Sequence, residues 1–246
     1  MKRLFGFLLI GLMLVAVLLT SCGGGGKLHV ATDATWPPFE SVSEQTKEIE
    51  GFDIDLLKAI AAKEKLDLEF INVGFDPLLA GIAQGQYDLA ISSITITEER
   101  KKDMLFSDPY FAAGQIVTVR ADNADIKSKD NLAGKTVGAQ IGTTGAIEMQ
   151  KMPGVTLKTY DDIGLAFQDL MNGQIAAVVA DNPMALSYVG KNSTKLKAVG
   201  AVFTDENYGI AISKKKADLV AKINSGLKAV KAEGLIDQLS KKWLEK

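Results

Sequence analysis

The chain of 246 residues contains little of the chemistry that metal centres and disulfide frameworks require. It has one cysteine and one histidine, which excludes a His/Cys metal cage, a Cys-His catalytic dyad and an intramolecular disulfide. Its 28 basic residues nearly balance its 30 acidic residues, and this balance argues against a nucleic-acid-binding surface. We therefore expect no metal site and no nucleic-acid partner, and we assign no residue to a cofactor or to catalysis.

Long apolar runs are also absent, except at the start of the chain. Residues 4–19, LFGFLLIGLMLVAVLL, have no polar side chain and follow Lys2 and Arg3. Basic, apolar and small-residue regions in this order are typical of a secretory signal peptide, which we place at 1–21. The Leu-Thr-Ser-Cys sequence that ends at Cys22 resembles a bacterial lipobox, in which the cysteine is lipidated and becomes the first mature residue. The alternative is a free cysteine at the end of an uncleaved anchor.

Four glycines follow this cysteine, and residues 22–26 are expected to form a flexible tether. No later stretch approaches the length of a membrane span. We therefore expect an exported domain that a lipid anchor alone holds to the membrane, either at the outer face of the cytoplasmic membrane or in a periplasm.

Strand-like and helix-like segments alternate from Leu28 onward. This order predicts the α/β class, with open sheets covered by helices. About 225 residues after the leader suit two modules of about 100 residues each. Strands are predicted at 28–32, 66–73, 88–92, 115–119, 135–139, 156–160 and 175–180, and helices at 53–65, after Asp76, Thr97, Thr143, Asp161 and Asn182, and over 217–245 with a break near Gly234.

Polar side chains follow four of these strands, where ligands of open α/β sheets bind. These residues complement an α-amino acid, because Arg100 can hold a carboxylate in a bidentate fork. Hydroxyls and helix-start N–H groups at Thr95 and Thr144 can complete that interaction. Asp181 offers a counter-charge to an ammonium group, and Asp33 is left for the ligand's side chain. The strand-end residues are Asp33, Ser92, Ser93, Thr95, Gly142, Thr143, Thr144 and Asp181, with Arg100 one helical turn beyond Thr95.

Each of these residues also has a purely structural interpretation. The two aspartates could cap turns, and the hydroxyls could bond the local backbone. Arg100 lies in EERKK, which could be a solvated helix face. Trp36 and Phe75 could belong to the core. Only their joint placement favours a binding site.

Five segments of the sequence carry a resemblance to a known family. VATDATWPPFE, GFDIDLLKAIA, SSITITEERKKDMLFSDPYF, GAQIGTTG and VVADNP are similar, in order and spacing, to the polar amino-acid-binding proteins of ATP-driven importers, the extracytoplasmic solute-binding family 3. The resemblance covers nearly the whole chain after the glycines. It implies a two-lobed periplasmic-binding-protein type II fold, in which each lobe is an open, mainly parallel sheet flanked by helices and the ligand cleft lies between the lobes. One lobe would comprise 27–109 and 209–246, the other 115–203, with hinge crossings at 110–114 and 204–208.

The resemblance also implies the roles of individual residues. Ser93, Thr95, Arg100 and Thr144 would hold the α-carboxylate, and Asp181 would hold the α-ammonium group. The side-chain end would be lined by Asp33, Trp36, Phe75 and Ser92, with Gln140 and Gly142 close by. A free L-amino acid would be captured by lobe closure and delivered to an ABC permease and its ATPase. We expect the protein to be a monomer.

The identity of the amino acid depends on a few positions. Glutamine binders of the family carry a histidine directly before the ammonium-binding aspartate, where this chain has Ala180. Asp33 beside the rings of Trp36 and Phe75 suits a cationic side chain, because a guanidinium can stack on aromatic faces while it pairs with a carboxylate. Arginine, lysine or histidine is therefore favoured over glutamine. Because Asp33 also occurs in glutamine binders, glutamine remains the alternative.

Two other classes of protein compete with this interpretation. A cyclohexadienyl dehydratase-like enzyme on the same fold would use Asp33 for proton transfer, whereas the complete pair of Arg100 and Asp181 favours a binding protein. A receptor ectodomain would need a transmembrane segment after the domain, and the sequence has no such apolar stretch there.

Overall fold

The computed structural model describes residues 26–245, so the predicted signal peptide and Cys22 lie outside the described residues. Over that range, no helix combines the length and the apolar composition needed to cross a membrane.

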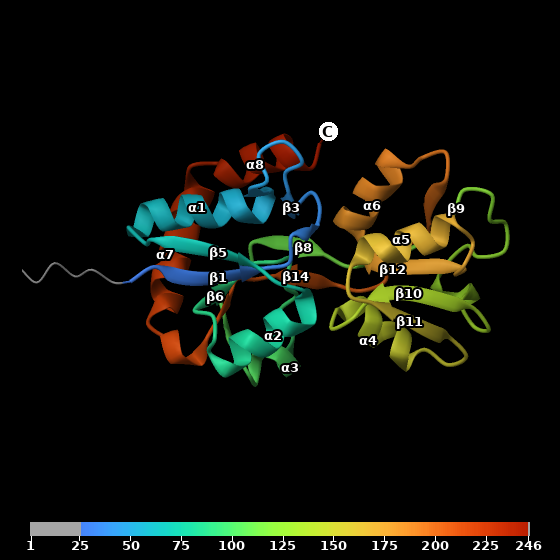
Figure 1. The fold of residues 1–246 in the computed structure, drawn as a ribbon, viewed down its shortest axis with the longest axis horizontal. Coiled ribbons are helices and arrows are strands. Elements are labelled where there is room, and N and C mark those ends of the chain that lie inside the picture. The colour runs from blue at the N-terminus through green and yellow to red at the C-terminus, as the bar shows by residue number, and fades with distance from the viewer. Residues whose placement is uncertain (1–25, 246) are drawn as a thin grey trace, which may run out of the picture.

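Lobe 1 is built on a five-stranded sheet in the order β5-β1-β6-β15-β7. Only β15 runs opposite to the other four strands. Helices α1 and α8 lie on one side of this sheet and α2 and α3 on the other (Figure 1), and α7 packs against α1 and α8. The strands are Leu28–Thr32 (β1), Leu68–Asn72 (β5), Leu89–Ala90 (β6), Leu105–Phe106 (β7) and Ala211–Ile212 (β15), and the helices are Phe52–Glu64 (α1), Phe75–Gln84 (α2), Glu98–Lys101 (α3), Leu219–Ala232 (α7) and Leu235–Trp243 (α8).

Lobe 2 repeats this plan with the order β11-β10-β12-β9-β13, in which only β9 is reversed. Helices α5 and α6 lie on one side of the sheet and α4 on the other (Figure 1). The strands are Gln115–Arg120 (β9), Thr136–Gln140 (β10), Thr156–Tyr160 (β11), Ala177–Asp181 (β12) and Leu196–Val199 (β13), and the helices are Thr144–Lys151 (α4), Ile163–Met171 (α5) and Asn182–Lys191 (α6). The predicted α/β fold of two mainly parallel sheets is confirmed.

Three minor elements complete the structure. A small sheet of Thr35–Trp36 (β2), Glu40–Val42 (β3) and Ile49–Glu50 (β4) lies beside lobe 1, and single 3-10 turns occur at Lys129–Asn131 and Lys214–Lys216. The lobes are joined by an antiparallel pair, Phe111–Ala113 (β8) and Glu206–Tyr208 (β14). The predicted crossings 110–114 and 204–208 contain these two strands.

An aromatic cluster packs around the paired strands β8 and β14. Phe111 and Tyr208 are direct partners in that pair, and their rings stack with centroids 5.9 Å apart. Phe39 meets both rings edge-on, at 5.1 and 5.6 Å. Phe52 and Tyr110 extend the cluster into lobe 1. Edge-to-face and offset rings add to the apolar burial, so these strands are firmly attached to lobe 1.

Several helices begin where hydroxyl caps were predicted. Thr97 accepts a hydrogen bond from the backbone N–H of Arg100 at the start of α3. Thr143 accepts one from Ala146 at the start of α4. Gly234, with φ 69°, separates α7 from α8, as the sequence predicted.

The predicted start of α2 is wrong, because its N-cap is Gly74 and not Asp76. Phe75 is buried as the first helical residue, and Asp76 falls in the first turn, where its charge still favours the helix dipole. The starts of α5 and α6 are each displaced by one residue, since Asp162 and Asp181 are their N-caps. The predicted strand 88–92 is ordered as β6 over two residues only.

Gly51 allows the start of α1 to approach β3 closely. It has φ 143°, and an added Cβ would lie 2.0 Å from the carbonyl oxygen of Phe39. We expect Gly51→Ala to lower the free energy of unfolding by about 3 kcal/mol or more, because both the backbone conformation and the space exclude a side chain. Gly190→Ala is the control, since that helical glycine has open space around it and alanine should stabilise it by about 0.5–1 kcal/mol. Urea unfolding of both variants measures the difference, and equal stabilities would contradict this interpretation.

Candidate functional site

The carboxyl ends of β1 and β6 in lobe 1 face those of β10 and β12 in lobe 2 across a narrow cavity. This is where open α/β sheets bind ligands. Ten of the eleven residues predicted for the site line the cavity, and the carbonyl of the eleventh, Gly142, bonds Arg100. The lining residues are Asp33, Trp36, Glu40, Phe75, Ser92, Ser93, Thr95, Arg100, Gln140, Thr143, Thr144 and Asp181.

Arg100 lies at one end of the cavity and connects the two lobes. One guanidinium nitrogen donates to the carbonyl of Thr95 in lobe 1 at 2.7 Å, and another donates to the carbonyl of Gly142 in lobe 2 at 2.9 Å. The guanidinium also lies over the ring of Phe75, 5.4 Å from its centroid. Burial lowers the pKa of Arg100 to about 10, against the opposing effect of Asp181 and Glu206. The group therefore stays cationic at neutral pH, and its five N–H donors exceed what these two carbonyls occupy.

Two carboxylates lie near Arg100, and only one of them was predicted. Asp181 accepts hydrogen bonds from Gln115 at 2.6 Å and from the hydroxyl of Tyr208 at 2.6 Å. Burial, followed by the charge of Glu206, raises the pKa of Asp181 to about 6. A cation placed between two such carboxylates would relieve their repulsion, so this end of the cavity can hold an ammonium group beside a carboxylate.

Glu206, on β14, receives both hydroxyls that were expected to hold a carboxylate. Its Oε2 accepts from Thr95 Oγ1 at 2.7 Å and from Thr144 Oγ1 at 2.8 Å. Thr95 belongs to lobe 1 and Thr144 to lobe 2, so Glu206 joins both lobes to the hinge. The two threonines are thus placed at the predicted end of the cavity, with their hydroxyls donating to a protein carboxylate.

Asp33 lies in the wall of the same cavity, and among the described residues its hydrogen-bond partners are not those of Arg100, Asp181 or Glu206. Its Oδ1 accepts from Thr35 Oγ1 at 2.9 Å, and its Oδ2 accepts from the amide of Gln140 in lobe 2 at 2.7 Å. Burial raises the pKa of Asp33, and these two hydrogen bonds oppose that effect. Its backbone N–H donates to Ser92 Oγ at 2.9 Å. The Asp33 carboxylate is buried and without a cationic partner among the described residues, which suits a cationic ligand group.

Sequence reasoning missed three residues at or beside this cavity. Glu40 lines it, while Gln115 and Glu206 bond residues that do. A usable signal existed for Glu206, since Glu206 and Tyr208 are two residues apart on a strand and therefore share a face. Thr143, named among the strand-end residues without a role toward the ligand, lines the cavity and also caps α4.

The charges define what this arrangement can do. One end offers Arg100 with Asp181 and Glu206, which complement the zwitterionic head of an α-amino acid. The cavity wall also offers the Asp33 carboxylate and the rings of Trp36 and Phe75. Within residues 26–245 no group of three or more His, Cys, Asp or Glu side chains could hold a metal ion.

Comparison with known proteins agrees with this geometry. The sequence matches the family model for bacterial extracellular solute-binding proteins, family 3, over residues 28–246. It is 34% identical to ABC transporter arginine-binding protein 1 of Escherichia coli over 94% of this chain and 98% of that protein. It is 32% identical to the ABC transporter glutamine-binding protein GlnH of Bacillus subtilis, over 100% of this chain and 98% of that protein.

The fold is also that of solved relatives. The arginine-, lysine-, histidine-binding protein ArtJ from Geobacillus stearothermophilus is 39% identical, with a TM-score of 0.84 over 90% of this chain and 96% of that one. The family model covers nearly all of the described residues, and the relatives named above are more than 30% identical to this chain. The chain belongs to the bacterial extracellular solute-binding proteins of family 3.

Proposed function

We propose that the protein binds a free L-amino acid with a cationic side chain, arginine, lysine or histidine, as the substrate-binding component of an ABC importer. The observation that carries the proposal is the buried Asp33 carboxylate, which lines the cavity and has no cationic partner among the described residues. Arg100 binds the α-carboxylate and Asp181, with Glu206, binds the α-ammonium group. Arginine- and histidine-binding relatives support the choice of a basic ligand.

Trp36 and Phe75 support a guanidinium or imidazolium near Asp33. Both rings are largely buried in the wall of the cavity, and cations over aromatic faces gain about 0.5–2 kcal/mol. The Arg100 guanidinium already lies over the Phe75 ring. A planar cation of the ligand can therefore stack only on the part of the Phe75 ring that Arg100 does not cover.

Glutamine is the second candidate, and one contact favours it. Asp33 accepts an amide N–H from Gln140 at 2.7 Å, so an amide donor of a ligand also fits this carboxylate. The Bacillus subtilis relative that binds glutamine is consistent with this alternative. Against it, Ala180 contributes no side-chain partner for a ligand amide.

The remaining parts of the proposal follow from the family. Its members are transport proteins, which supports an exported binding protein that serves an ABC permease and its ATPase and has no enzymatic activity. We further propose that the protein is a monomer and that a lipid on Cys22 is its only membrane contact.

Thermal unfolding against a ligand panel tests the proposed function. The purified protein is refolded from denaturant to remove bound ligand and is then heated with each of the twenty amino acids, ornithine or prephenate. At a hundredfold excess over the dissociation constant, a true ligand should raise the midpoint by roughly 5–10 °C. A rise with arginine, lysine or histidine supports the proposal, and a rise with glutamine alone favours the second candidate. A rise with prephenate alone would favour the enzyme.

Ligand capture is proposed to occur by closure of the lobes. The two halves of the site belong to different lobes, so a ligand that contacts both favours the closed form. We expect the radius of gyration from X-ray scattering to decrease when arginine is added to the refolded protein. Identical scattering curves with and without arginine, under conditions where binding is saturated, would contradict closure.

The pKa of Asp181 predicts how affinity depends on pH. Burial raises this pKa to about 6 in the ligand-free protein, and an ammonium ligand requires the ionised form. Affinity should therefore fall as the pH drops below 6, by up to tenfold per pH unit, because binding must then release a proton. Titration calorimetry with arginine at pH 5, 6 and 7 measures this. Asp181→Asn should bind more weakly with a flatter profile over that range, and an unchanged slope would assign the effect to another group.

A further inference from the structure

Two carboxyl groups are fully buried in lobe 1 directly behind the site. Glu40 on β3 and Asp53 on α1 are both 0% exposed. Neither takes part in an ion pair within the described residues, and the cavity-lining position of Glu40 does not give it a cationic neighbour. Two unpaired negative charges buried side by side would be very unfavourable. The charge state of this pair therefore needs an explanation.

The backbone brings the two carboxyl groups together. The N–H of Asp53 donates to the carbonyl of Phe39 at 3.0 Å, and that of Phe52 donates to Pro38 at 3.1 Å. Gly51 permits this approach, because its Cβ would collide with Phe39. The segment before β3 is thus tied to the first turn of α1, and the side chains of Glu40 and Asp53 interact directly.

The hydrogen bonds distinguish the two carboxyl groups. Asp53 Oδ2 accepts two bonds, from the N–H of Ser93 at 2.7 Å and from the hydroxyl of Tyr110 at 2.7 Å. Its place in the first turn of α1 also favours a negative charge. Glu40 Oε1 accepts only one bond, from Ser92 Oγ at 3.0 Å. Asp53 is thus the better site for the charge and Glu40 the better site for a proton.

One oxygen of each group has no other partner. Glu40 Oε2 and Asp53 Oδ1 are buried, with no hydrogen bond to any other described group. A single proton between the two carboxyl groups would satisfy both oxygens. Burial raises the pKa of both residues, and the Asp53 charge raises that of Glu40 further.

Among the described residues, no cation compensates the charge of the pair. The titratable groups that face it are Asp33 from the end of β1, Tyr110 beside β8 and Tyr208 from β14. The residues from the end of β6, Ser92 and Ser93, do not titrate. Glu40 and Asp53 each follow a ring of the aromatic cluster in sequence, Phe39 and Phe52, and both rings are fully buried.

We propose that Glu40 and Asp53 share one proton at neutral pH and, in that state, act as positioning residues for the site. Ser92 carries the connection, because its hydroxyl accepts from the N–H of Asp33 and donates to Glu40. Asp53 holds Ser93 in a left-handed conformation, φ 48°, which a non-glycine residue rarely adopts. The pair thereby fixes the two strand ends that present Asp33 and Ser93 to the ligand.

Loss of the shared proton has a defined direction. The folded protein binds this proton more tightly than the unfolded chain does, since both pKa values are raised. The stability that it contributes is complete below the ordinary carboxyl range and is lost as the pH rises through the folded pKa. Affinity for the ligand should fall with it, because two adjacent buried charges would displace Ser92 and Asp33.

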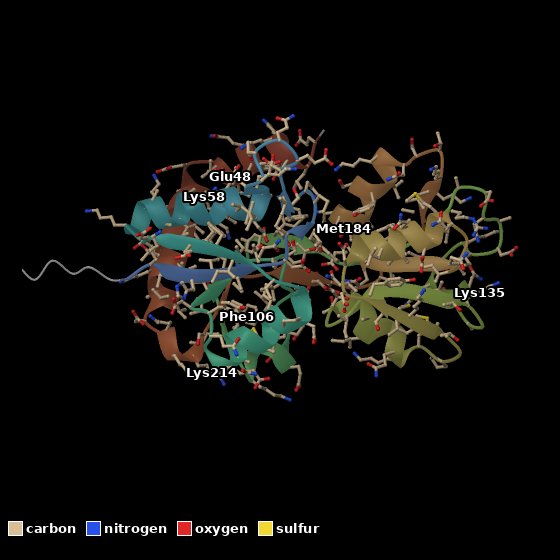
Figure 2. All side chains as sticks on the ribbon, viewed as in Figure 1. Glu48, Lys58, Phe106, Lys135, Met184 and Lys214 are labelled. Carbon is tan, nitrogen blue, oxygen red and sulfur yellow. The ribbon has the colours of Figure 1, made fainter. Side chains whose placement is uncertain are left out.

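Infrared spectroscopy detects the proton without any ligand. At pH 8, where Asp181 is ionised, the ligand-free protein should show the carbonyl stretching band of a protonated carboxyl group. The band should be lost in Glu40→Gln and should titrate at lower pH in Asp53→Asn. It should remain in Asp33→Asn, and in Glu48→Gln, an exposed glutamate at the edge of lobe 1 (Figure 2). No band in the unsubstituted protein, or the same band in Glu40→Gln, would overturn the proposal.

Arginine affinity gives the second readout, which rests on the proposed function. As the pH rises above the point at which the infrared band disappears, the affinity of the unsubstituted protein and of Glu48→Gln for arginine should fall, by up to tenfold per pH unit. Glu40→Gln should change by less than threefold over the same rise in pH, because its amide donates to Asp53 without titrating; a tenfold change in this variant would contradict the proposal. If the band behaves as expected and no amino acid binds, the carboxyl pair stands and the proposed function fails. If arginine binds and the band is absent, the proposed function stands and the proposal of a shared proton fails.

Discussion

Replacement of Arg100 by methionine should lower the affinity for every amino acid by about a thousandfold or more. The ligand's α-carboxylate would then be buried without a cation, and a broken buried charge pair costs about 3–5 kcal/mol. Arg100→Lys should bind more weakly than the unsubstituted protein and more tightly than the methionine variant, because lysine keeps the charge and loses the bidentate fork. Titration calorimetry with arginine and glutamine measures all three proteins.

Arg120→Met is the matched control for this substitution. Arg120 lies at the end of β9 and forms a partly exposed ion pair with Asp122 at 3.1 Å, and such pairs contribute at most about 1 kcal/mol. The Arg120→Met variant should bind arginine and glutamine as tightly as the unsubstituted protein does. Because Arg100 also links Thr95 to Gly142 across the lobes, thermal unfolding should confirm that the Arg100 variants are folded. A folded Arg100→Met protein that binds arginine with unchanged affinity would remove Arg100 from the site.

Asp33→Asn should separate cationic from neutral ligands. We expect arginine to bind about a hundredfold more weakly, a loss of about 2.7 kcal/mol, because the guanidinium loses its buried counter-charge. Citrulline has nearly the same shape and no side-chain charge, and its affinity should change by less than about threefold. Calorimetric titration of both ligands gives the ratio directly.

The control for Asp33→Asn is Asp103→Asn, an exposed aspartate after α3. The Asp103→Asn substitution should change neither the affinity for arginine nor that for citrulline. Equal losses for arginine and citrulline in Asp33→Asn would mean that Asp33 supports the fold of the site and does not select charge. In that case the hydrogen bonds from Thr35 and Gln140 would be its main role.

The strand-end residues could be predicted because sheet topology decides where they lie. Asp33 and Ser92 come after β1 and β6, and Asp181 ends β12; each of these strands has a parallel neighbour in its sheet, so their side chains lie at the carboxyl edges of the sheets. Gln140, at the end of β10, was expected only from the family resemblance. The caps Thr97 and Thr143 could be predicted because capping depends on a few consecutive residues. Local sequence was sufficient for these features.

The buried carboxyl groups could not be predicted in the same way. Glu40 and Glu206 each lie on a strand of three residues, and such short strands give no clear alternation of polar and apolar positions. Their burial depends on packing against Asp53, and against Thr95 and Thr144, which are remote in sequence. The early start of α2 at Phe75 has a similar cause, since tertiary burial of that ring outweighs the capping preference of Asp76.

Calorimetric titration of the refolded protein with three matched ligands tests most directly whether both ends of the site act together. L-arginine carries the α-carboxylate and the guanidinium, agmatine lacks the α-carboxylate, and L-citrulline lacks the side-chain charge. We expect arginine to bind at least a hundredfold more tightly than either analogue, because Arg100 requires the carboxylate and Asp33 requires the cation. Agmatine or citrulline binding as tightly as arginine would contradict recognition of a cationic amino acid at both ends.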